Sequence, residues 1–313
     1  MRCDSSRHDR PRKLSIFSSA RPRRTLARRP NRTLLATALA HCYPVGSGRL
    51  RIVKLCVLAS SSSGNCTFIR TNSTRILVDA GLSRKDVFTR LASIGENPDE
   101  LTGIVVTHEH SDHVCGLISI AKYFTTKQNR QLPLYLSRLT APTIDWGEFT
   151  PAVEHFQAGS RFTVGDIEVD SFTVPHDAVD PVGFCFTAEG VRIGVVTDLG
   201  YVPDSLHFHL RGAHVVLLES NHDLNMLKVG PYPWSVKQRV MGRKGHLSND
   251  VACDFIRRDL DSSVHTLILG HLSENNNHPA IVRMAATEAL AGRALFTSLT
   301  IAEPRKVCEA FVY

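Results

Sequence analysis

The sequence predicts a layered α/β protein with two β-sheets between outer helices. Three observations lead to this fold class. Strand-like runs cluster in two halves of residues 53–313, and runs with helical apolar spacing flank each half. Polar residues also recur where predicted strands end, as they do at the ligand-binding edges of open sheets. Strand-rich halves flanked by helices pack as layers with the sheets inside.

The N-terminal half of this region alternates short strands with turns and helices. Residues 71–74 are Thr, Asn, Ser and Thr, which favour a hairpin turn between the second and third strands. Ser83 is expected to cap a helix that runs to about Ile94, and a short helix is expected at 140–146. The predicted strands are 54–59, 66–70, 75–79, 103–107 and 132–136.

The C-terminal half begins with short strands joined by glycine turns and continues with alternating helices and strands. Mostly antiparallel strands are predicted at 161–164, 167–174, 183–188 and 192–197. The remaining elements are strands at 214–218 and 265–269, helices at 203–210, 248–258 and 279–290, and an edge strand at 309–313.

The net charge of +7 comes from the N-terminal segment. Residues 1–52 contain thirteen Lys and Arg residues and two acidic residues, so this segment carries +11 and residues 53–313 carry −4. Its Arg-, Ser- and Pro-rich composition, without periodicity, favours a disordered extension. Three interpretations of the segment are a transit peptide, a nucleic-acid-binding arm and a mis-assigned translation start.

Composition also limits the compartment and the partners. The eight cysteines occur singly, without a CxxC pair. This spacing argues against a disulfide framework or a thiolate zinc site, and it favours the reducing cytoplasm. No apolar run approaches the ~18 residues of a membrane span, so no membrane partner is expected.

The strongest chemical signal is the hexad His-Glu-His-Ser-Asp-His at 108–113. It follows the β-branched strand 103–107 and precedes apolar residues at helical spacing, so it lies on a strand-to-helix turn. Three imidazoles and a carboxylate crowded at a strand end form a site for a borderline-soft cation. A polar turn with hydrogen-bonded histidines is the simpler alternative, but the density of ligand-type residues favours the metal site.

Other ligand-type residues also follow predicted strands. One histidine at such a position is usually a satisfied turn residue, but six strand ends that behave alike around the hexad favour one shared site. Such a set suits two cations bridged by a carboxylate, an arrangement that serves hydrolytic displacement. The residues at these strand ends are Asp79, His108 with His110, His176, Asp198, Glu219 and His271.

In this order the motifs resemble those of the metallo-β-lactamase fold, an αββα four-layer sandwich with a binuclear metal site. The resemblance implies that residues 53–313 form a catalytic domain of this fold that binds two divalent ions, Zn or Mn. Flavodiiron oxidoreductases of the fold have an acid where this chain has His110, so the ligand set points to hydrolysis. The implied ligands are His108, His110 and His176 for one metal and Asp112, His113 and His271 for the other, with Asp198 bridging them and Asp79 orienting ligands.

Further motifs, from about residue 53 to the C-terminus, resemble the WalJ/YycJ exonuclease family. Specific ones are Glu-Ser-Asn-His-Asp at 219–223, Gly-x-Tyr-Pro-Trp at 230–234 and Gly-His-Leu-Ser-Asn at 245–249. The resemblance implies a DNA 5′-to-3′ exonuclease with a role in DNA repair or maintenance and a metal-bridging hydroxide as its nucleophile. Members tend to begin with Met where Val53 stands, which favours the mis-assigned start.

A phosphodiesterase also needs a proton donor and substrate contacts. The motif order of related tRNA 3′-processing nucleases implies that Glu219 orients His246 for proton transfer, and Asp112 is assigned to catalysis as well as to the metal. The alternative for the Glu219–His246 pair is a polar pair that holds the loop. Two roles remain open for Trp234 and Tyr232, namely stacking on a terminal base and packing in a loop. Six further residues are expected to contact the substrate, and the alternative for them is turn capping or a solvated basic face. They are Asn221, His222, Lys237, Arg239, Asn276 and Asn277.

Two other functions compete with the nuclease. A small-molecule hydrolase of the same fold, of the thioesterase or lactamase type, keeps the metal ligands but needs neither Glu219 with His246 nor the basic run at 237–244. A non-catalytic DNA-binding protein gains nothing from an open binuclear site. Nucleic acid, as DNA with a free 5′ end, is therefore the expected partner, and the oligomeric state is left open.

Overall fold

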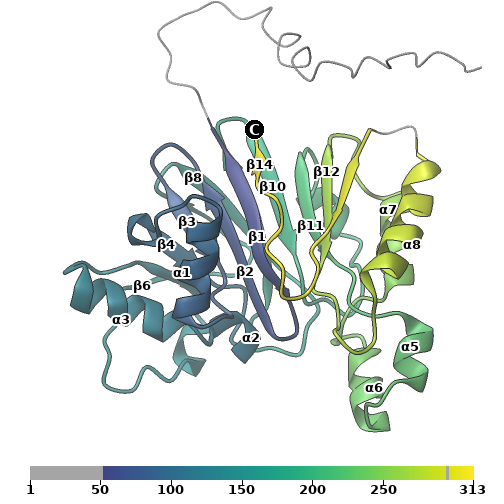
Figure 1. Ribbon diagram of the computed structural model, residues 1–313, viewed down its shortest axis with the longest axis horizontal. Coiled ribbons are helices and arrows are strands. Elements are labelled where there is room, and N and C mark those ends of the chain that lie inside the picture. The colour runs from purple at the N-terminus through teal and green to yellow at the C-terminus, as the bar shows by residue number, and fades with distance from the viewer. Residues whose placement is uncertain (1–51, 294–295) are drawn as a thin grey trace, which may run out of the picture. The chain divides into compact units, whose positions relative to one another are not determined.

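The computed structural model describes residues 52–293 and 296–313, in which two seven-stranded sheets face each other (Figure 1). The prediction of a disordered extension at 1–52 lies outside the described residues, apart from Ile52. None of the helices described in these two ranges is both long and apolar enough to cross a lipid bilayer.

The first sheet has the strand order β14-β1-β2-β3-β4-β5-β6. The predicted hairpin is confirmed, because β2 and β3 pair in antiparallel register, and the predicted C-terminal edge strand β14 pairs with β1. From β3 to β6 the neighbours are parallel. The strands are β1 (Lys54–Ser61), β2 (Gly64–Arg70), β3 (Arg75–Val78), β4 (Gly103–Val105), β5 (Leu134–Ser137), β6 (Val153–Phe156) and β14 (Phe311–Val312).

The second sheet has the order β13-β12-β11-β10-β9-β8-β7. Neighbours from β7 to β10 are antiparallel, as predicted, and neighbours from β10 to β13 are parallel. The strands are β7 (Arg161–Val164), β8 (Ile167–Thr173), β9 (Val182–Ala188), β10 (Val191–Val196), β11 (Val215–Glu219), β12 (Thr266–Gly270) and β13 (Ser298–Ile301).

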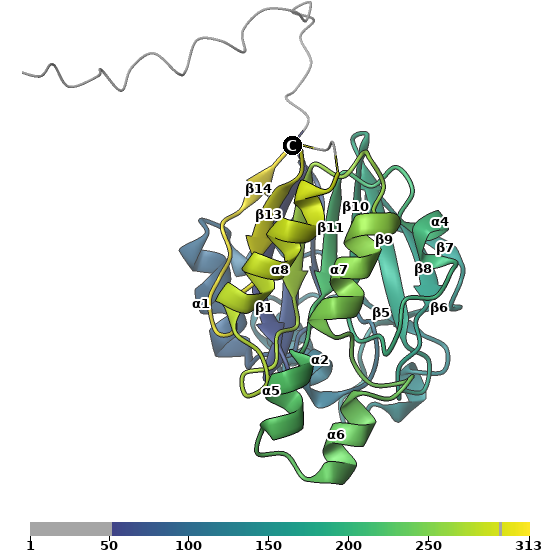
Figure 2. The same ribbon diagram turned by 90° about the vertical axis from the view of Figure 1, so that its right-hand side faces the viewer.

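Helices cover the outer face of each sheet, which confirms the αββα order of layers (Figures 1 and 2). α1 (Arg84–Ser93) and α3 (Leu117–Lys127) pack on the first sheet, and α7 (Asn249–Arg258) and α8 (Pro279–Ala291) pack on the second. A third apolar core lies between the sheets, where residues such as Val57 and Phe184 from opposite sheets meet. The shorter helices are α2 (Ser111–Val114), α4 (Leu206–His209), α5 (Leu224–Val229), α6 (Trp234–Val240) and the 3₁₀ turns Pro98–Glu100 and Ala141–Thr143.

The helix expected after the hexad is broken in two at Gly116. The Gly116 amide donates to the carbonyl of Ala80, and a Cβ at this position would lie 2.0 Å from the carbonyl oxygen of Leu82. The backbone after β3 therefore packs against the start of α3, and only glycine fits there. The short helix expected at 140–146 is instead one 3₁₀ turn that contains Pro142, and α5, α6, β6 and β13 were not predicted.

The carboxyl ends of the parallel strands in both sheets meet at one edge of the sandwich. Asp79 follows β3, Asp198 follows β10, Glu219 is the last residue of β11 and His271 follows β12. Because parallel strands end at a common edge, residues far apart in the sequence come together there. This edge is where α2, α5 and α6 also lie (Figures 1 and 2).

Candidate metal centre

One group of histidines comes from the hexad and from the loop after β8. The side chains of His108, His110 and His176 each offer a nitrogen within 4.8 Å of the others. His176 Nε2 lies 3.3 Å from His110 Nδ1, a distance at which two ring nitrogens aim at a shared point. His108 and His176 are buried, and burial lowers the pKa of both imidazoles. Neutral imidazoles are the form that binds a metal.

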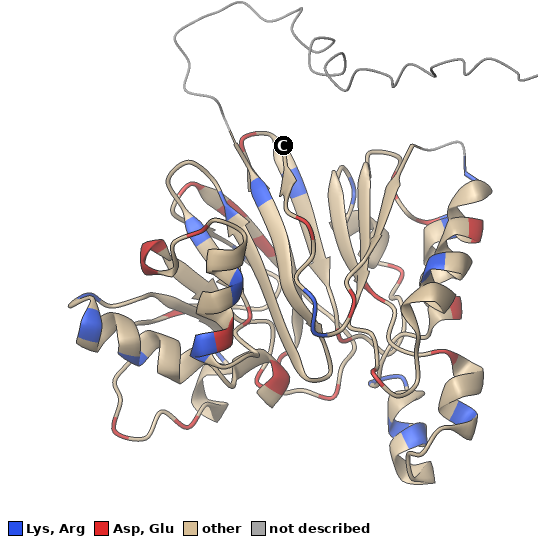
Figure 3. Cartoon of the chain, viewed as in Figure 1, with Lys and Arg blue, Asp and Glu red and all other residues tan. Residues whose placement is uncertain are grey.

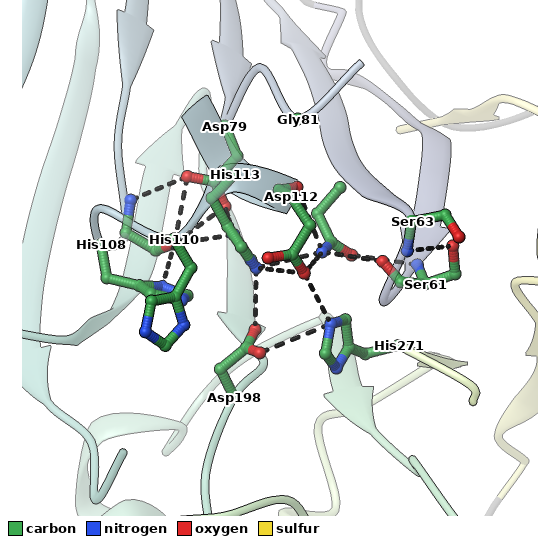
Figure 4. A network of polar contacts seen from close by, with 12 residues as sticks. Ser61, Ser63, Asp79, Gly81, His108, His110, Asp112, His113, Asp198 and His271 are labelled. Atoms are coloured by element: carbon green, nitrogen blue, oxygen red, sulfur yellow. Dashed lines mark hydrogen bonds and ion pairs between the residues drawn. The ribbon is translucent and has the colours of Figure 1, made fainter. Parts of the chain in front are cut away.

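A second donor group lies beside the first and uses residues from both sheets. Asp112, His113 and His271 converge, with Asp112 Oδ2 at 3.5 Å from the Nε2 atoms of both histidines. Asp198 lies between the two groups: Oδ2 is 3.3 Å from His113 Nε2, and Oδ1 is 3.4 Å from His271 Nε2 and 3.9 Å from His176 Nε2 (Figure 4). The structure thus brings together all seven residues that the sequence analysis assigns to metal binding.

Four of the five imidazoles, those of His108, His113, His176 and His271, are held through their Nδ1 atoms, so that Nε2 faces the centre. A ligand histidine is normally fixed by such a partner on its other nitrogen, which sets the tautomer and the ring direction. Asp79, expected to orient ligands, does so for His113 and also binds the hydroxyl and amide of Thr107. The Nδ1 partners are Thr107 Oγ1 for His108 at 3.0 Å, Asp79 Oδ2 for His113 at 2.8 Å, the Gly245 carbonyl for His176 at 3.0 Å and Glu219 Oε1 for His271 at 2.9 Å.

Buried polar atoms at this centre lack a hydrogen-bond partner. His108 Nε2, His271 Nε2 and Asp198 Oδ2 are all enclosed and form no hydrogen bond, although carboxylate or imidazole atoms lie 3.3–3.5 Å from the last two. A buried polar atom without a partner costs free energy, about 1–3 kcal/mol each, and a cation would satisfy all three. Although burial lowers it, the Asp198 carboxylate raises the pKa of His271 to about 10. A site whose carboxylates favour positive charge on imidazole also favours a bound cation, so these residues fit a divalent metal.

Three residues of the centre have a left-handed backbone. Asp79, Asp198 and His271 have φ values of 63°, 60° and 55°. Such conformations are uncommon for residues with a Cβ and cluster at functional sites. Asp79 and His271 directly follow the last residue of β3 and β12, and Asp198 lies two residues beyond the end of β10, so each left-handed turn leads the chain out of a sheet at a candidate ligand. The residue types alone did not indicate this backbone geometry.

The Ser-rich turn between β1 and β2 contacts donors from both sheets, a role that the sequence analysis missed. Asn65 Nδ2 lies 3.2 Å from Asp112 Oδ2 and 3.0 Å from His113 Nε2. The hydroxyl of Ser60 accepts a hydrogen bond of 2.7 Å from the His271 amide. A Ser-Asn-Gly composition is typical of any turn, so only the fold reveals that these side chains point at the centre.

Glu219 is fully buried and shares one oxygen between two imidazoles. Its Oε1 lies 2.8 Å from His246 Nδ1 and 2.9 Å from His271 Nδ1, and its Oε2 accepts from the Leu199 amide at 2.9 Å. Burial raises the pKa of a carboxyl, but His246 and His271 lower that of Glu219 to about 2. Although burial lowers it, Glu219 in turn raises the pKa of His246. The pair expected from the sequence is therefore formed.

A pocket of about 310 Å³ opens over the centre. It is lined by His110, Asp112, Asp198 and His246, and Arg239 from α6 stands at its wall. The Arg239 guanidinium is exposed and forms an ion pair with Asp177. A larger cavity of about 460 Å³ lies between α4 and α7, away from these residues.

Most of the other expected substrate contacts are instead buried parts of the loops. Asn276 is fully buried, Lys237 Nζ donates to the Lys228 carbonyl, and burial lowers the pKa of His222 to about 4. The Asn221 amide donates to the His271 carbonyl, and the Asn277 amide donates to the carbonyls of residues 220 and 221. All five side chains are buried in the loops that carry the candidate ligands, and direct contact with substrate stays a prediction for them.

Two facing sheets with histidines and aspartates gathered at one edge define a metallo-β-lactamase-fold, metal-dependent hydrolase. Residues 74–271 match the Beta-lactamase superfamily domain, and the chain belongs to that superfamily. Within it, the chain belongs to the WalJ/YycJ family, on the basis of the relatives that follow.

The chain is 36% identical over 243 residues to Exodeoxyribonuclease WalJ of Streptococcus pneumoniae serotype 2, which covers 76% of this chain and 88% of that protein. It is 36% identical over 246 residues to Exodeoxyribonuclease YycJ of Bacillus anthracis, which covers 75% of this chain and 88% of that protein. Among solved structures, the metallo-β-lactamase-fold protein YhfI from Bacillus subtilis aligns with a TM-score of 0.63 at 16% identity, over 82% of this chain and 99% of that one. This structural likeness shows the fold.

Proposed function

We propose that the protein is a metal-dependent exodeoxyribonuclease that removes nucleotides from the 5′ end of DNA and serves DNA maintenance or repair. The observation that carries this proposal is the Glu219–His246 pair placed beside two donor groups that share Asp198. The two relatives described above, each 36% identical to this chain, are named exodeoxyribonucleases. The six cysteines among the described residues are free thiols, consistent with a cytoplasmic location.

The two donor groups are proposed to hold two divalent cations, Zn or Mn. His108, His110 and His176 would bind one, Asp112, His113 and His271 the other, and Asp198 would bridge them. When bound, the pair would supply charge neutralisation and an acidified water for attack on phosphorus. Asp79 and Glu219 keep the histidine ligands in the tautomer that binds metal.

His246 is proposed to supply the proton for the leaving oxygen. Its Nδ1–H donates to Glu219 Oε1, which leaves Nε2 as the atom that gives up a proton. Because Glu219 raises the pKa of His246, more of the imidazole is protonated near neutral pH than in a free histidine. As hydroxide bonds to phosphorus and the phosphorus–oxygen bond breaks, the Nε2 proton of His246 passes to the departing oxygen.

Arg239 is proposed to bind a substrate phosphate at the mouth of the pocket. It is the one Lys or Arg residue among those that line this pocket. Its partner Asp177 is a single, partly exposed carboxylate, whereas Arg239 is exposed, and ion pairs at the surface contribute little, about 0–1 kcal/mol. A phosphate with two oxygens in the plane of the guanidinium can therefore displace it.

The test is hydrolysis of DNA strands labelled at the 5′ or the 3′ end, with Mn²⁺. We expect release of label from the 5′ end first, and no release by a His110→Ala, Asp112→Ala variant. His246→Ala should lower kcat by about 10²–10⁴-fold while the metal content stays unchanged. Intact DNA in the presence of metal-loaded protein would overturn the proposal and favour a small-molecule hydrolase, to be assayed with thioesters and lactams.

A further inference from the structure

A basic helical arm extends from the edge of the sandwich that carries the metal centre. The arm, residues 223–245, contains α5 and α6, which lie beyond the sheet edges in both views (Figures 1 and 2). It contains five Lys or Arg residues and one Asp, a net charge of +4, whereas the rest of residues 53–313 carries −8. Figure 3 shows basic residues on both of its helices. The arm is therefore a segment of net positive charge in a domain whose remaining residues carry a net negative charge.

The arm also exposes large apolar side chains. Val229 is 86% exposed, Trp234 62% and Val236 37%. These are three of the ten large apolar residues most exposed among the described residues, within a segment of 23 residues. A tryptophan ring presented to solvent beside cations is unfavourable for the free protein and is typical of a surface that is covered by a partner.

The C-terminal end of the arm is fixed to the centre. At its C-terminal end, the Gly245 carbonyl accepts from His176 Nδ1 at 3.0 Å, and the next residue is His246. Arg243 lies over the Tyr201 ring at 4.3 Å, close to the strand end that carries Asp198. Trp234 and Arg239 share α6 and are separated by about 7.5 Å along its axis, at 1.5 Å per residue. Because Arg239 lines the pocket, the Trp234 ring lies within a few nucleotides' length of it.

We propose that this arm binds a nucleic-acid strand, with the Trp234 ring stacked on an unpaired base and Lys228, Arg239 and Lys244 on backbone phosphates. Aromatic stacking tolerates any base, and cations along the path follow the phosphates. This proposal rests on the proposed nuclease function. Charge distinguishes the occupant from a second copy of this chain, because a symmetric contact would bring two arms of +4 together.

Tryptophan fluorescence provides a local test in the full chain. The protein has two tryptophans, Trp146 and Trp234, so a Trp146→Phe variant reports on Trp234 alone. The titrant is a single strand of thymidines with hydrolysis-resistant phosphorothioate linkages, in the presence of Mn²⁺. We expect quenching by the single strand and none by inorganic tripolyphosphate, which supplies charge without a base. Equal quenching by tripolyphosphate, or no quenching by the strand, would overturn the stacking.

Affinity variants separate stacking from charge. Trp234→Ala should weaken strand binding by about tenfold, and Trp234→Phe should restore most of the affinity. Phe208→Ala is the matched control, since Phe208 is 66% exposed and lies outside the arm. Lys244→Gln should lower the slope of log Kd against log salt by about 0.7, whereas Arg258→Gln on α7 should leave it unchanged. All variants contain residues 1–52, so the charge of that segment is the same in each protein and does not affect the comparison of their affinities.

The outcomes keep the two proposals apart. Trp234-dependent binding without hydrolysis of unmodified DNA would contradict the nuclease function and retain the arm as a strand-binding surface. Hydrolysis with unchanged binding by Trp234→Ala would retain the nuclease and overturn the arm. Sedimentation that shows Trp234→Ala abolishing self-association, with strand binding intact, would also overturn it and assign the surface to a second copy.

Discussion

At the scale of single residues, Glu219 links the metal centre to the proposed proton donor. One oxygen accepts from both His246 and His271, so one carboxylate fixes the tautomers of a metal ligand and of an acid. Loss of Glu219 would therefore disturb metal binding and proton transfer together, whereas loss of His246 would disturb proton transfer alone. Glu219 and His246 therefore have different roles in the structure, whereas the sequence analysis describes them only as a pair.

Asn65 is predicted to position Asp112 for metal binding. Its amide lies 3.2 Å from Asp112 Oδ2, and its side chain is held by the backbone of Ser61. Asn65→Ala should weaken binding at the group formed by Asp112, His113 and His271 by about 10–100-fold, because the carboxylate loses the donor that orients it. Stepwise metal titration, with the bound metal measured by elemental analysis, checks this.

The matched control for this prediction is Asn97→Ala. Asn97 caps the 3₁₀ turn Pro98–Glu100 through a 3.1 Å bond to the Asp99 amide, on an exposed loop. The Asn97→Ala substitution also removes an asparagine side chain, but at a position outside the centre, so the affinities of both metal-binding groups should stay unchanged. Equal affinities in the Asn65→Ala protein and the unchanged protein would show that Asn65 only closes its turn.

Residue types at strand ends, together with the resemblance to the metallo-β-lactamase fold, led to the predicted set of ligands but not to its geometry. Imidazoles and carboxylates at strand ends are rare enough to indicate a metal site, and all seven predicted ligands lie together. The left-handed backbone at Asp79, Asp198 and His271 is imposed by packing at the sheet edge, so no local pattern predicts it. The sequence analysis expected the asparagines at 221, 276 and 277 to contact substrate. They are buried because loops distant in the chain close over them, and the sequence does not show that burial.

At the scale of elements, prediction succeeded where apolar periodicity was long. α7 and α8 carry regular apolar faces, and their limits match the sequence prediction within one or two residues. α5 and α6 were missed because they are short and are separated by Gly230, Pro231 and Pro233, which read as a loop. The start of α5 is instead fixed by a cap, because Asp223 accepts from two amides in the first turn of that helix.

A buried ion-pair cluster at Glu96 is predicted to stabilise the first sheet. Glu96 Oε1 lies 2.6 Å from Lys54 Nζ on β1 and 3.0 Å from Arg70 on β2, with 3% of its side chain exposed. Glu96→Ala should lower the free energy of unfolding by about 3 kcal/mol, because two cations lose their partner in a partly buried site. Denaturant unfolding measures the loss.

Glu100→Ala provides the comparison for Glu96. Glu100 pairs with Arg75 at 2.9 Å, but half of its side chain is exposed. Exposed pairs contribute about 0–1 kcal/mol, so this variant should unfold close to the unchanged protein. Similar losses for both variants would mean that burial does not determine the strength of the Glu96 cluster.

At the scale of the whole molecule, the metal centre joins the two sheets. Asp112 and His113 follow β4 of the first sheet, whereas Asp198 and His271 follow β10 and β12 of the second. The sequence predicted two sheets inside helices, and this is confirmed. It did not predict the order of the strands, because the partners of β4 and β12 are set by packing between segments far apart in the chain.

Metal removal is therefore predicted to loosen both sheets at once. A cation bound only by the folded state stabilises it by RT ln(1 + [L]/Kd), about 2.7 kcal/mol at a hundredfold excess over Kd. A chelator should lower Tm, and Mn²⁺ should restore it, with a much smaller change in the His110→Ala, Asp112→Ala variant. Hydrogen exchange should show that metal protects the amides of Ala80 and Gly81, which hydrogen-bond beside the hexad, together with those of Ser220 and Ser273 in the second sheet's loops. Protection confined to one of these pairs of amides would contradict a shared centre. A cation bound by donors from both sheets loses ligands when the edge of either sheet opens, so its binding should protect both edges.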